Sequence, residues 1–200
     1  MTDHARWETR FSAPGYLFGK EPNAFLKAQA SRFSPGMRAL AVADGEGRNG
    51  VWLAERGLNV LAIDFSETAL AKARALADER GVRIATEAAD ISSWRWPHAA
   101  YDVIASIFVH LAGAERDAYF GNLKVALKPG GLLLMESYRP EQLNYRTGGP
   151  PDAARTYTRA LLQAAFADFS ELDIREHDSI ISEGTAHVGM SALIDLVGKK

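Results

Sequence analysis

The chain contains no cysteine among its 200 residues, which excludes disulfides, thiolate metal sites and cysteine nucleophiles. A basic excess is also missing, because 23 Lys and Arg stand against 25 Asp and Glu, a formal net charge of −2. A protein that binds nucleic acid by neutralising many phosphates needs such an excess. We therefore expect no nucleic-acid partner.

Long apolar runs are absent as well. No stretch approaches the roughly 20 apolar residues of a membrane span, and no apolar segment follows the first residues. We therefore expect no membrane segment, no secretory signal and a cytoplasmic location. The five histidines are scattered and none pairs with another at ligand spacing, so we expect no metal site.

The remaining composition, 47% hydrophobic and 24% charged, is that of an ordinary globular protein. The first 35 residues differ from the rest, because six aromatic residues are interrupted there by Pro and Gly. Such a segment is typical of a flap or of short helices that cover something. We predict a single domain over residues 1–200, with an N-terminal helical lid at 1–35 and a cofactor-binding core at 36–200.

From Met37 onward, short apolar segments alternate with helical patterns, which predicts a parallel sheet with helices on both faces. Near the C-terminus, two long strand-like segments surround Glu183-Gly184 and predict an antiparallel hairpin. The fold class is therefore α/β, a Rossmann-like, doubly wound, mostly parallel seven-stranded sheet with an antiparallel C-terminal strand. The predicted strands are residues 37–43, 59–63, 82–86, 101–108, 132–136 (after a sharp turn at 128–131), 169–181 and 187–197.

A glycine-rich segment, GEGRNG at residues 45–50, follows the first predicted strand and opens a helix. Its glycines permit a tight turn and let a ligand approach the backbone closely. Asp64 ends the next strand nineteen residues after Gly45, where a carboxylate can accept both hydroxyls of a ribose. This pair of features favours an adenosine-containing ligand without saying which one.

The charges around the first glycine favour S-adenosylmethionine over a dinucleotide. Asp44 and Glu46 suit the ammonium group of S-adenosylmethionine and would repel a pyrophosphate. Asp90, after the third strand, can accept a hydrogen bond from the adenine amino group. An NAD(P)-dependent oxidoreductase stays an alternative, although no Tyr-x-x-x-Lys pair is recognisable, and a non-catalytic module that binds S-adenosylmethionine is a second one.

Several motifs together carry a resemblance to a known family. They are YLFG at 16–19 with Pro22-Asn23, GEGRN at 45–49, DFS at 64–66, Ala89-Asp90, YDVI at 101–104 and LKPGG at 127–131. With these motifs the chain resembles class I S-adenosylmethionine-dependent methyltransferases, and small bacterial stand-alone enzymes of the tellurite-resistance and thiopurine-methyltransferase type in particular. The resemblance implies methyl transfer from S-adenosyl-L-methionine to a small-molecule acceptor, with S-adenosyl-L-homocysteine as product, by a monomer or homodimer.

The loop and the resemblance together assign a set of residues to cofactor binding. One departure from the family concerns the acid that usually stands four residues before the first motif glycine, because that position holds Ala41 here. Either Asp44 has taken over its role or cofactor affinity is reduced. The expected cofactor residues are Tyr16, Asp44, Gly45, Glu46, Gly47, Arg48, Asn49, Asp64, Phe65, Ser66, Ala89, Asp90, Ile91, Ser106 and Ile107.

The acceptor side is less strongly marked. Methyl transfer mainly needs alignment, and it needs a base only when the acceptor holds its proton tightly. His110 follows the fourth strand at the ligand-binding edge of the sheet, where it serves as a catalytic base or caps the following loop. Tyr138 and Arg139 follow the fifth strand and either hold the acceptor or form a plain polar strand end. The aromatic residues expected to contact the acceptor are Trp7, Phe11 and Phe18.

Overall fold

The computed structural model describes residues 3–200, so Met1 and Thr2, the start of the predicted lid, lie outside the described residues. The chain divides into two compact units: Met1–Trp94 with Glu183–Ala186, and Arg95–Ser182 with His187–Lys200. The strands form one mixed sheet of seven in the order β3-β2-β1-β4-β5-β7-β6. The predicted Rossmann-like class is therefore confirmed, whereas the single domain with a lid at 1–35 and a core at 36–200 stays a prediction.

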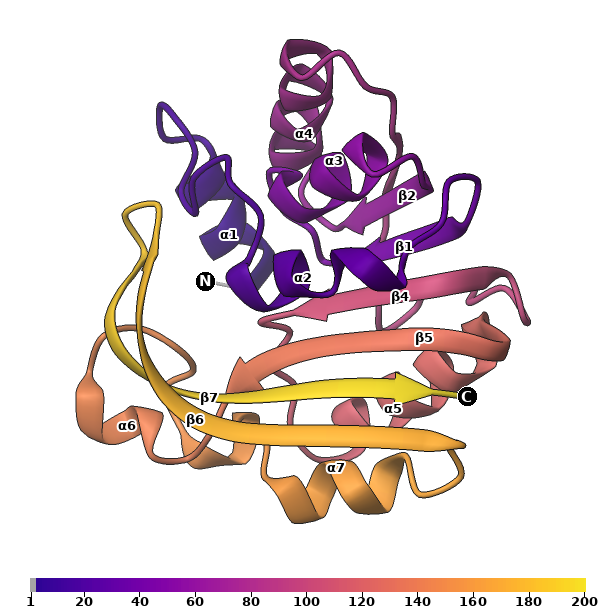
Figure 1. Cartoon of the computed structure of the whole chain (residues 1–200). Coiled ribbons are helices and arrows are strands. Elements are labelled where there is room, and N and C mark those ends of the chain that lie inside the picture. Colours follow the sequence, from indigo (N-terminus) through magenta and orange to yellow (C-terminus); the bar gives the residue numbers. More distant parts are fainter. Residues whose placement is uncertain (1–2) are drawn as a thin grey trace. The chain divides into compact units, whose positions relative to one another are not determined.

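The first unit is built on three parallel strands, in which β1 pairs with β2 and β2 pairs with β3. Helices α3 and α4 pack beside them (Figure 1), and each helix has several apolar side chains that are buried. Its elements are α1 (Asp3–Phe11), α2 (Ala24–Ala28), the 3-10 helix η1 (Ala30–Arg32), β1 (Arg38–Val42), α3 (Arg48–Glu55), β2 (Asn59–Asp64), α4 (Glu67–Glu79) and β3 (Ala85–Ala88).

The second unit combines one parallel strand pair with an antiparallel edge. Strand β4 is parallel to β5, and β5 is antiparallel to β7. Figure 1 shows β5, β7 and β6 running side by side. Its elements are β4 (Tyr101–Ile107), α5 (Gly113–Ala126), β5 (Leu127–Tyr138), α6 (Gln142–Tyr145), the 3-10 helix η2 (Ala153–Arg155), α7 (Arg159–Ala165), β6 (Glu171–Glu183) and β7 (His187–Lys199).

Local sequence signals set several helix ends. The side chains of Asn23, Ser66 and Thr158 cap α2, α4 and α7 by accepting a hydrogen bond from the backbone N–H three residues further on. Gly57 and Gly81 follow α3 and α4 with φ of 85° and 68°, the left-handed conformation that ends a helix and favours glycine.

Two predicted strand boundaries were wrong. Strand β3 begins at Ala85, because the apolar residues Val82 and Ile84 pack instead against the buried cluster that contains Val51 and Leu76. Strand β5 continues through the predicted turn at 128–131. There the N–H of Gly130 donates to the carbonyl oxygen of Lys200, so the C-terminal residue pairs with this segment.

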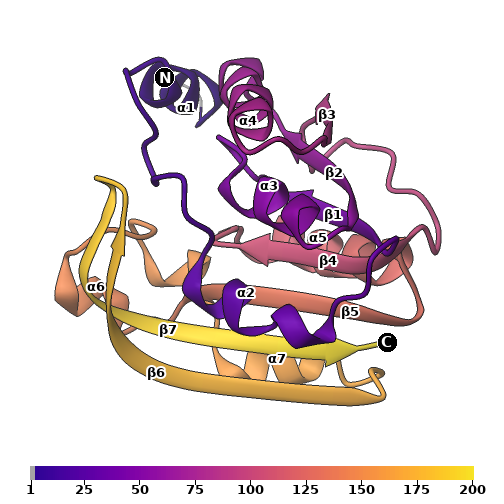
Figure 2. The same ribbon diagram turned by 45° about the horizontal axis from the view of Figure 1, so that its top comes forward.

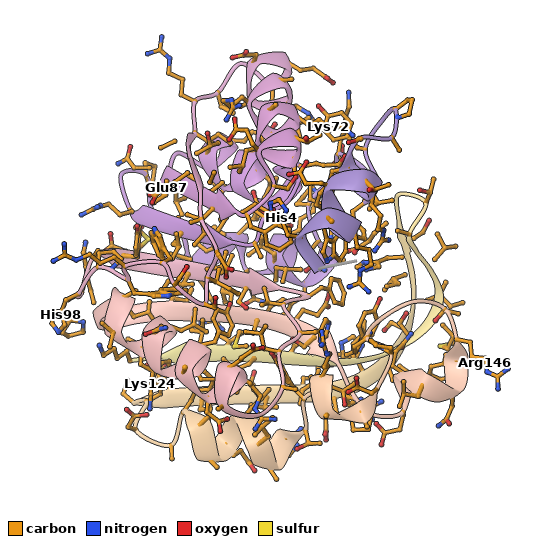
Figure 3. All side chains as sticks on the ribbon, turned by 180° about the vertical axis from the view of Figure 1, so that it is seen from behind. His4, Lys72, Glu87, His98, Lys124 and Arg146 are labelled. Atoms are coloured by element: carbon orange, nitrogen blue, oxygen red, sulfur yellow. The ribbon has the colours of Figure 1, made fainter. Side chains whose placement is uncertain are left out.

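The N-terminal segment is fixed to α4. Helix α1 lies beside α4 (Figure 2), and the hydroxyl of Tyr16 donates to the carbonyl oxygen of Lys72 at 3.2 Å. The ammonium group of Lys72 (Figure 3) donates to the carbonyl oxygens of Ala13 and Gly15 at 2.8 and 2.7 Å. One lysine on α4 therefore holds the chain that leads out of α1.

None of the helices in residues 3–200 is long and apolar enough to cross a membrane. The cytoplasmic location and the monomeric or homodimeric state stay predictions.

Gly47 allows close packing between the loop and α4, and this can be measured. Gly47 and Gly36 have φ of 89° and 87°, but a Cβ on Gly47 would stand 2.5 Å from the Cβ of Ala73, whereas one on Gly36 would meet nothing within 4 Å. We expect Gly36→Ala to lower the free energy of unfolding by about 1 kcal/mol through backbone strain. Gly47→Ala should lower it by about 1–3 kcal/mol more through overpacking. Urea unfolding measures both, and equal losses would contradict this packing.

Candidate functional site

The glycine-rich loop of the first unit turns tightly after β1. Ala43, Gly45 and Gly47 have φ of 49°, 56° and 89°. Ala43 is a non-glycine residue in the left-handed region, which is uncommon and is a mark of functional turns. The loop leads directly into α3, with Gly47 as the residue before its first turn. The predicted strand, glycine loop and helix are all present.

Asp64 ties this loop to the neighbouring strand. Its carboxylate accepts hydrogen bonds from the backbone N–H of Gly45 and of Ser66, both at 2.9 Å. Burial raises the pKa of Asp64, and these two N–H donors act in the opposite direction by favouring the charged form. A carboxylate has about four acceptor positions, so Asp64 keeps capacity for the ribose hydroxyls that the sequence assigns to it.

Asp44 is half-buried beside the loop, and its Oδ2 accepts from the N–H of Gly50 at 2.9 Å. Desolvation raises its pKa to about 7. Nothing in the first unit gives this carboxylate an ammonium or guanidinium partner within ion-pair distance among the described residues. A carboxylate in this state suits a cationic ligand group.

Glu46 has a different environment from the one expected. The side chain is buried; one oxygen pairs with the ammonium of Lys72 at 2.8 Å and the other accepts from the N–H of Leu17 at 2.6 Å. Both oxygens therefore hold the N-terminal segment on the loop. The sequence placed Glu46 beside a cofactor ammonium, whereas its contacts make it an anchor for residues 16–17.

Arg48 and Asn49 begin α3 and are both buried. Arg48 pairs with Glu183 at 2.8 Å, and Asn49 accepts from the backbone N–H of Asn23 at 3.0 Å. The amide of Asn23 also donates to Glu183 at 3.0 Å. The two residues predicted to contact the cofactor are thus part of a polar network that includes the tip of the β6–β7 hairpin.

The remaining first-unit residues vary in exposure. Ser66 is fully buried as the cap of α4, and the ring of Phe65 lies 5.2 Å from that of His4. Asp90 is exposed, and its Oδ1 accepts from the N–H and the hydroxyl of Ser92. Ala89 is buried, and Ile91 is half-buried.

The three predicted aromatic acceptor contacts gather in one cluster. Trp7 stacks on Phe11 with ring centroids 5.3 Å apart and lies 6.1 Å from Phe18. The guanidinium of Arg10 covers Trp7 at 4.3 Å. Phe11 lies directly over the glycine loop, because a Cβ on Gly45 would stand 3.2 Å from its ring. The aromatic segment therefore covers the cofactor loop itself.

In the second unit, His110 follows β4 and is half-buried. Its Nδ1 lies 3.0 Å from the carbonyl oxygen of Arg155, which can only accept, so Nδ1 carries the proton. Its Nε2 is buried and has no hydrogen-bond partner among residues 3–200. Burial lowers the pKa of His110 to about 4. The imidazole is therefore neutral, with an available lone pair on Nε2.

Aromatic rings surround His110. Phe108 has φ of 57°, an outlier for a bulky residue, and its ring stacks on Tyr138 at 4.8 Å and meets His187 edge-on at 4.7 Å. His110 itself stacks on Tyr138 at 5.4 Å and lies 5.8 Å from Tyr157. Tyr138 was predicted to be here, and the structure brings it together with His110.

Ser106 and Arg139, two other predicted residues of this unit, have partners outside the His110 cluster. Ser106 is fully buried, and its hydroxyl lies 2.7 Å from that of Tyr119 on α5; Ile107 is buried as well. Arg139 donates to Asp178 and, at 3.2 Å, to Glu141, so two acids already neutralise its guanidinium. These contacts favour structural roles for the side chains of Ser106 and Arg139.

Sequence reasoning missed Tyr157 and His187 as neighbours of His110. Tyr157 and His187 stand 47 and 77 residues after His110, and no local spacing connects them. The segment between β5 and Tyr157 packs on the cluster, because a Cβ on Gly149 would stand 3.1 Å from the ring of Tyr138. The sequence signal that was available is the run Gly148-Gly149-Pro150-Pro151, which is typical of a shaped loop.

Comparison with known proteins agrees with this arrangement. Residues 39–131 match the family described as "Methyltransferase domain". This part of the chain, nearly half of its length, is therefore similar to a methyltransferase domain. These similarities favour S-adenosylmethionine as the cofactor over the nicotinamide cofactor of the oxidoreductase alternative.

The chain is also similar to individual known proteins. The demethylmenaquinone methyltransferase of Thermus thermophilus is 32% identical over 105 residues, which cover 52% of this chain and 48% of that protein. One similar solved structure is described as "Conversion of a Disulfide Bond into a Thioacetal Group during Echinomycin Biosynthesis". It has a TM-score of 0.72 at 21% identity, and the match covers 98% of this chain and 91% of that one. TehB from Haemophilus influenzae has a TM-score of 0.71 at 18% identity, and the match covers 98% of this chain and 66% of that one. The chain spans about half the length of the curated relatives it matches.

The cofactor residues of the first unit fit S-adenosylmethionine. Asp44 presents a carboxylate for the ammonium, Asp64 for the ribose hydroxyls and Asp90 for the adenine amino group. The left-handed loop exposes backbone to a ligand. These three assignments stay predictions, and the role of Asp44 can be tested.

Asp44→Asn should weaken S-adenosylhomocysteine binding by about 10–100-fold above pH 7, because a charged hydrogen bond contributes roughly 1.5–3 kcal/mol. Adenosine, which lacks the amino group, should bind equally to both proteins. Because the pKa of Asp44 is raised to about 7, its carboxylate form is present above pH 7 and is lost below it. The difference between wild type and variant should therefore shrink as the pH falls.

Calorimetry at pH 6 and pH 8 measures this. Asp78→Asn, which removes an exposed charge from α4, is the matched control and should bind as wild type does. Equal losses for adenosine and S-adenosylhomocysteine would show that Asp44 shapes the loop instead of holding the amino group.

Proposed function

We propose that this chain transfers a methyl group from S-adenosylmethionine to a small acceptor with an acidic X–H group, of which a thiol is the best fit. The observation that carries the proposal is the state of His110: the imidazole is half-buried and neutral, Nδ1 is bound to a carbonyl oxygen, and the buried Nε2 has no partner among the described residues. A buried nitrogen of this kind calls for a partner. An acceptor X–H is such a partner.

The pKa of His110 limits which acceptors it can serve. A base with a pKa of about 4 can align an X–H group but is too weak to ionise an alcohol. A thiol loses its proton far more readily, with an unperturbed pKa of about 8.5. Sulfur also makes favourable contacts with aromatic rings, and rings of Phe108, Tyr138 and Tyr157 surround the imidazole.

S-adenosylmethionine, when bound, supplies a methyl group activated by a sulfonium. The chain's own residues then have three tasks. In the first unit, Asp44, Asp64 and Asp90 hold the cofactor, while Phe11 covers the loop and limits its contact with water. In the second unit, Nε2 of His110 accepts a hydrogen bond from the acceptor X–H, which orients the acceptor, and it takes up the proton that the acceptor loses on methylation.

The test is release of S-adenosylhomocysteine with pairs of acceptors that differ only in a thiol or a hydroxyl. The thiol of each pair should be methylated faster. His110→Ala should lower kcat/KM by about 100-fold, the scale of a lost general-base contact, while binding of S-adenosylhomocysteine is unchanged. His98→Ala removes an exposed imidazole from the same unit and should have wild-type activity.

Two results would contradict the proposal. Equal activity of His110→Ala and His98→Ala would remove His110 from the reaction. Tight S-adenosylhomocysteine binding with no product from any small acceptor would favour the non-catalytic module.

A further inference from the structure

Three strands of the second unit bring Glu136, His177 and Asp195 together. Each offers one ligand atom, and these atoms all lie within 4.8 Å of one another. Glu136 on β5 and Asp195 on β7 are directly opposite in the antiparallel register. They are only 3% and 7% exposed, so two carboxyl groups face each other out of water.

One oxygen of this acidic pair lacks a donor among the described residues. A buried carboxylate needs a compensating charge or hydrogen bonds. Oδ1 of Asp195 is buried and has no hydrogen-bond donor among residues 3–200.

The imidazole of His177 has the orientation of a metal ligand. Its Nε2 lies 3.0 Å from Oδ2 of Asp195, and its Nδ1 lies 2.8 Å from the hydroxyl of Ser179. A histidine that binds a metal through one ring nitrogen normally donates the other N–H to a nearby oxygen, which fixes its tautomer. The Ser179 hydroxyl can accept that bond and leave Nε2 for the cluster.

We propose that Glu136, His177 and Asp195 form a binding site for a first-row divalent cation of the Zn²⁺ class, which joins β5, β6 and β7. One imidazole nitrogen with two carboxylate oxygens suits such ions, and solvent can complete the coordination. Bonds of about 2.0–2.2 Å hold ligand atoms at most about 4 Å apart, so a small contraction of the cluster suffices. The cation takes the place of the proton between His177 and Asp195.

The experiment uses the full chain after treatment with a chelator, titrated calorimetrically with ZnCl₂ and, separately, MnCl₂. We expect one equivalent to bind and the thermal unfolding midpoint to rise with metal concentration. His177→Ala and Asp195→Asn should each weaken binding by about 100-fold or more, since loss of even an outer contact can reach 100-fold. His98→Ala is the matched control, because His98 is exposed and points outward from the ribbon (Figure 3).

The chain has no cysteine to bind zinc elsewhere, which simplifies the reading of the titration. Should His177→Ala fail to fold, His177→Gln keeps a polar side chain in place and is titrated instead. Equal zinc binding by the His177 and His98 variants would overturn the proposal. So would a wild type that binds neither metal.

Discussion

The buried carboxylate of Asp64 is the contact on which the first unit depends. It joins three places, because it stands at the end of β2, accepts from the N–H of Gly45 in the loop after β1, and accepts from the N–H of Ser66 at the start of α4. Gly45, which this carboxylate holds, is one of three loop residues in the left-handed conformation, with Ala43 and Gly47. The turn that precedes α3 is therefore attached to β2 and α4 through one side chain.

A similar arrangement, with different residues, follows β4. Phe108 takes a left-handed conformation that is costly for a bulky side chain. Its stacking on Tyr138 and His187 stabilises that conformation and encloses His110. Strain and a buried, unpartnered nitrogen occur next to each other, at the carboxyl end of a parallel strand. This coincidence is what separates a functional cluster from ordinary aromatic packing.

Local signals predicted the fold well and the site only in part. Alternating apolar and helical patterns and the Glu183-Gly184 turn depend on neighbours in sequence, and both were confirmed. The strand predicted from residue 82 begins later because the apolar side chains of Val82 and Ile84 pack on α3 and α4. Partners distant in sequence, such as Lys72 for Glu46 and Glu183 for Arg48, were beyond any spacing argument. The same holds for Glu136, His177 and Asp195, which only the strand order brings together.

The central claim is that the glycine loop, with the carboxylate of Asp44 beside it, selects S-adenosylmethionine over a dinucleotide. Calorimetric titration of the intact chain with S-adenosylhomocysteine and with NAD⁺ under the same conditions tests it most directly. We predict one equivalent of S-adenosylhomocysteine bound and no measurable heat from NAD⁺, because a pyrophosphate would meet the carboxylate of Asp44, which has no cationic partner within ion-pair distance among the described residues. Tighter binding of NAD⁺ than of S-adenosylhomocysteine would contradict it.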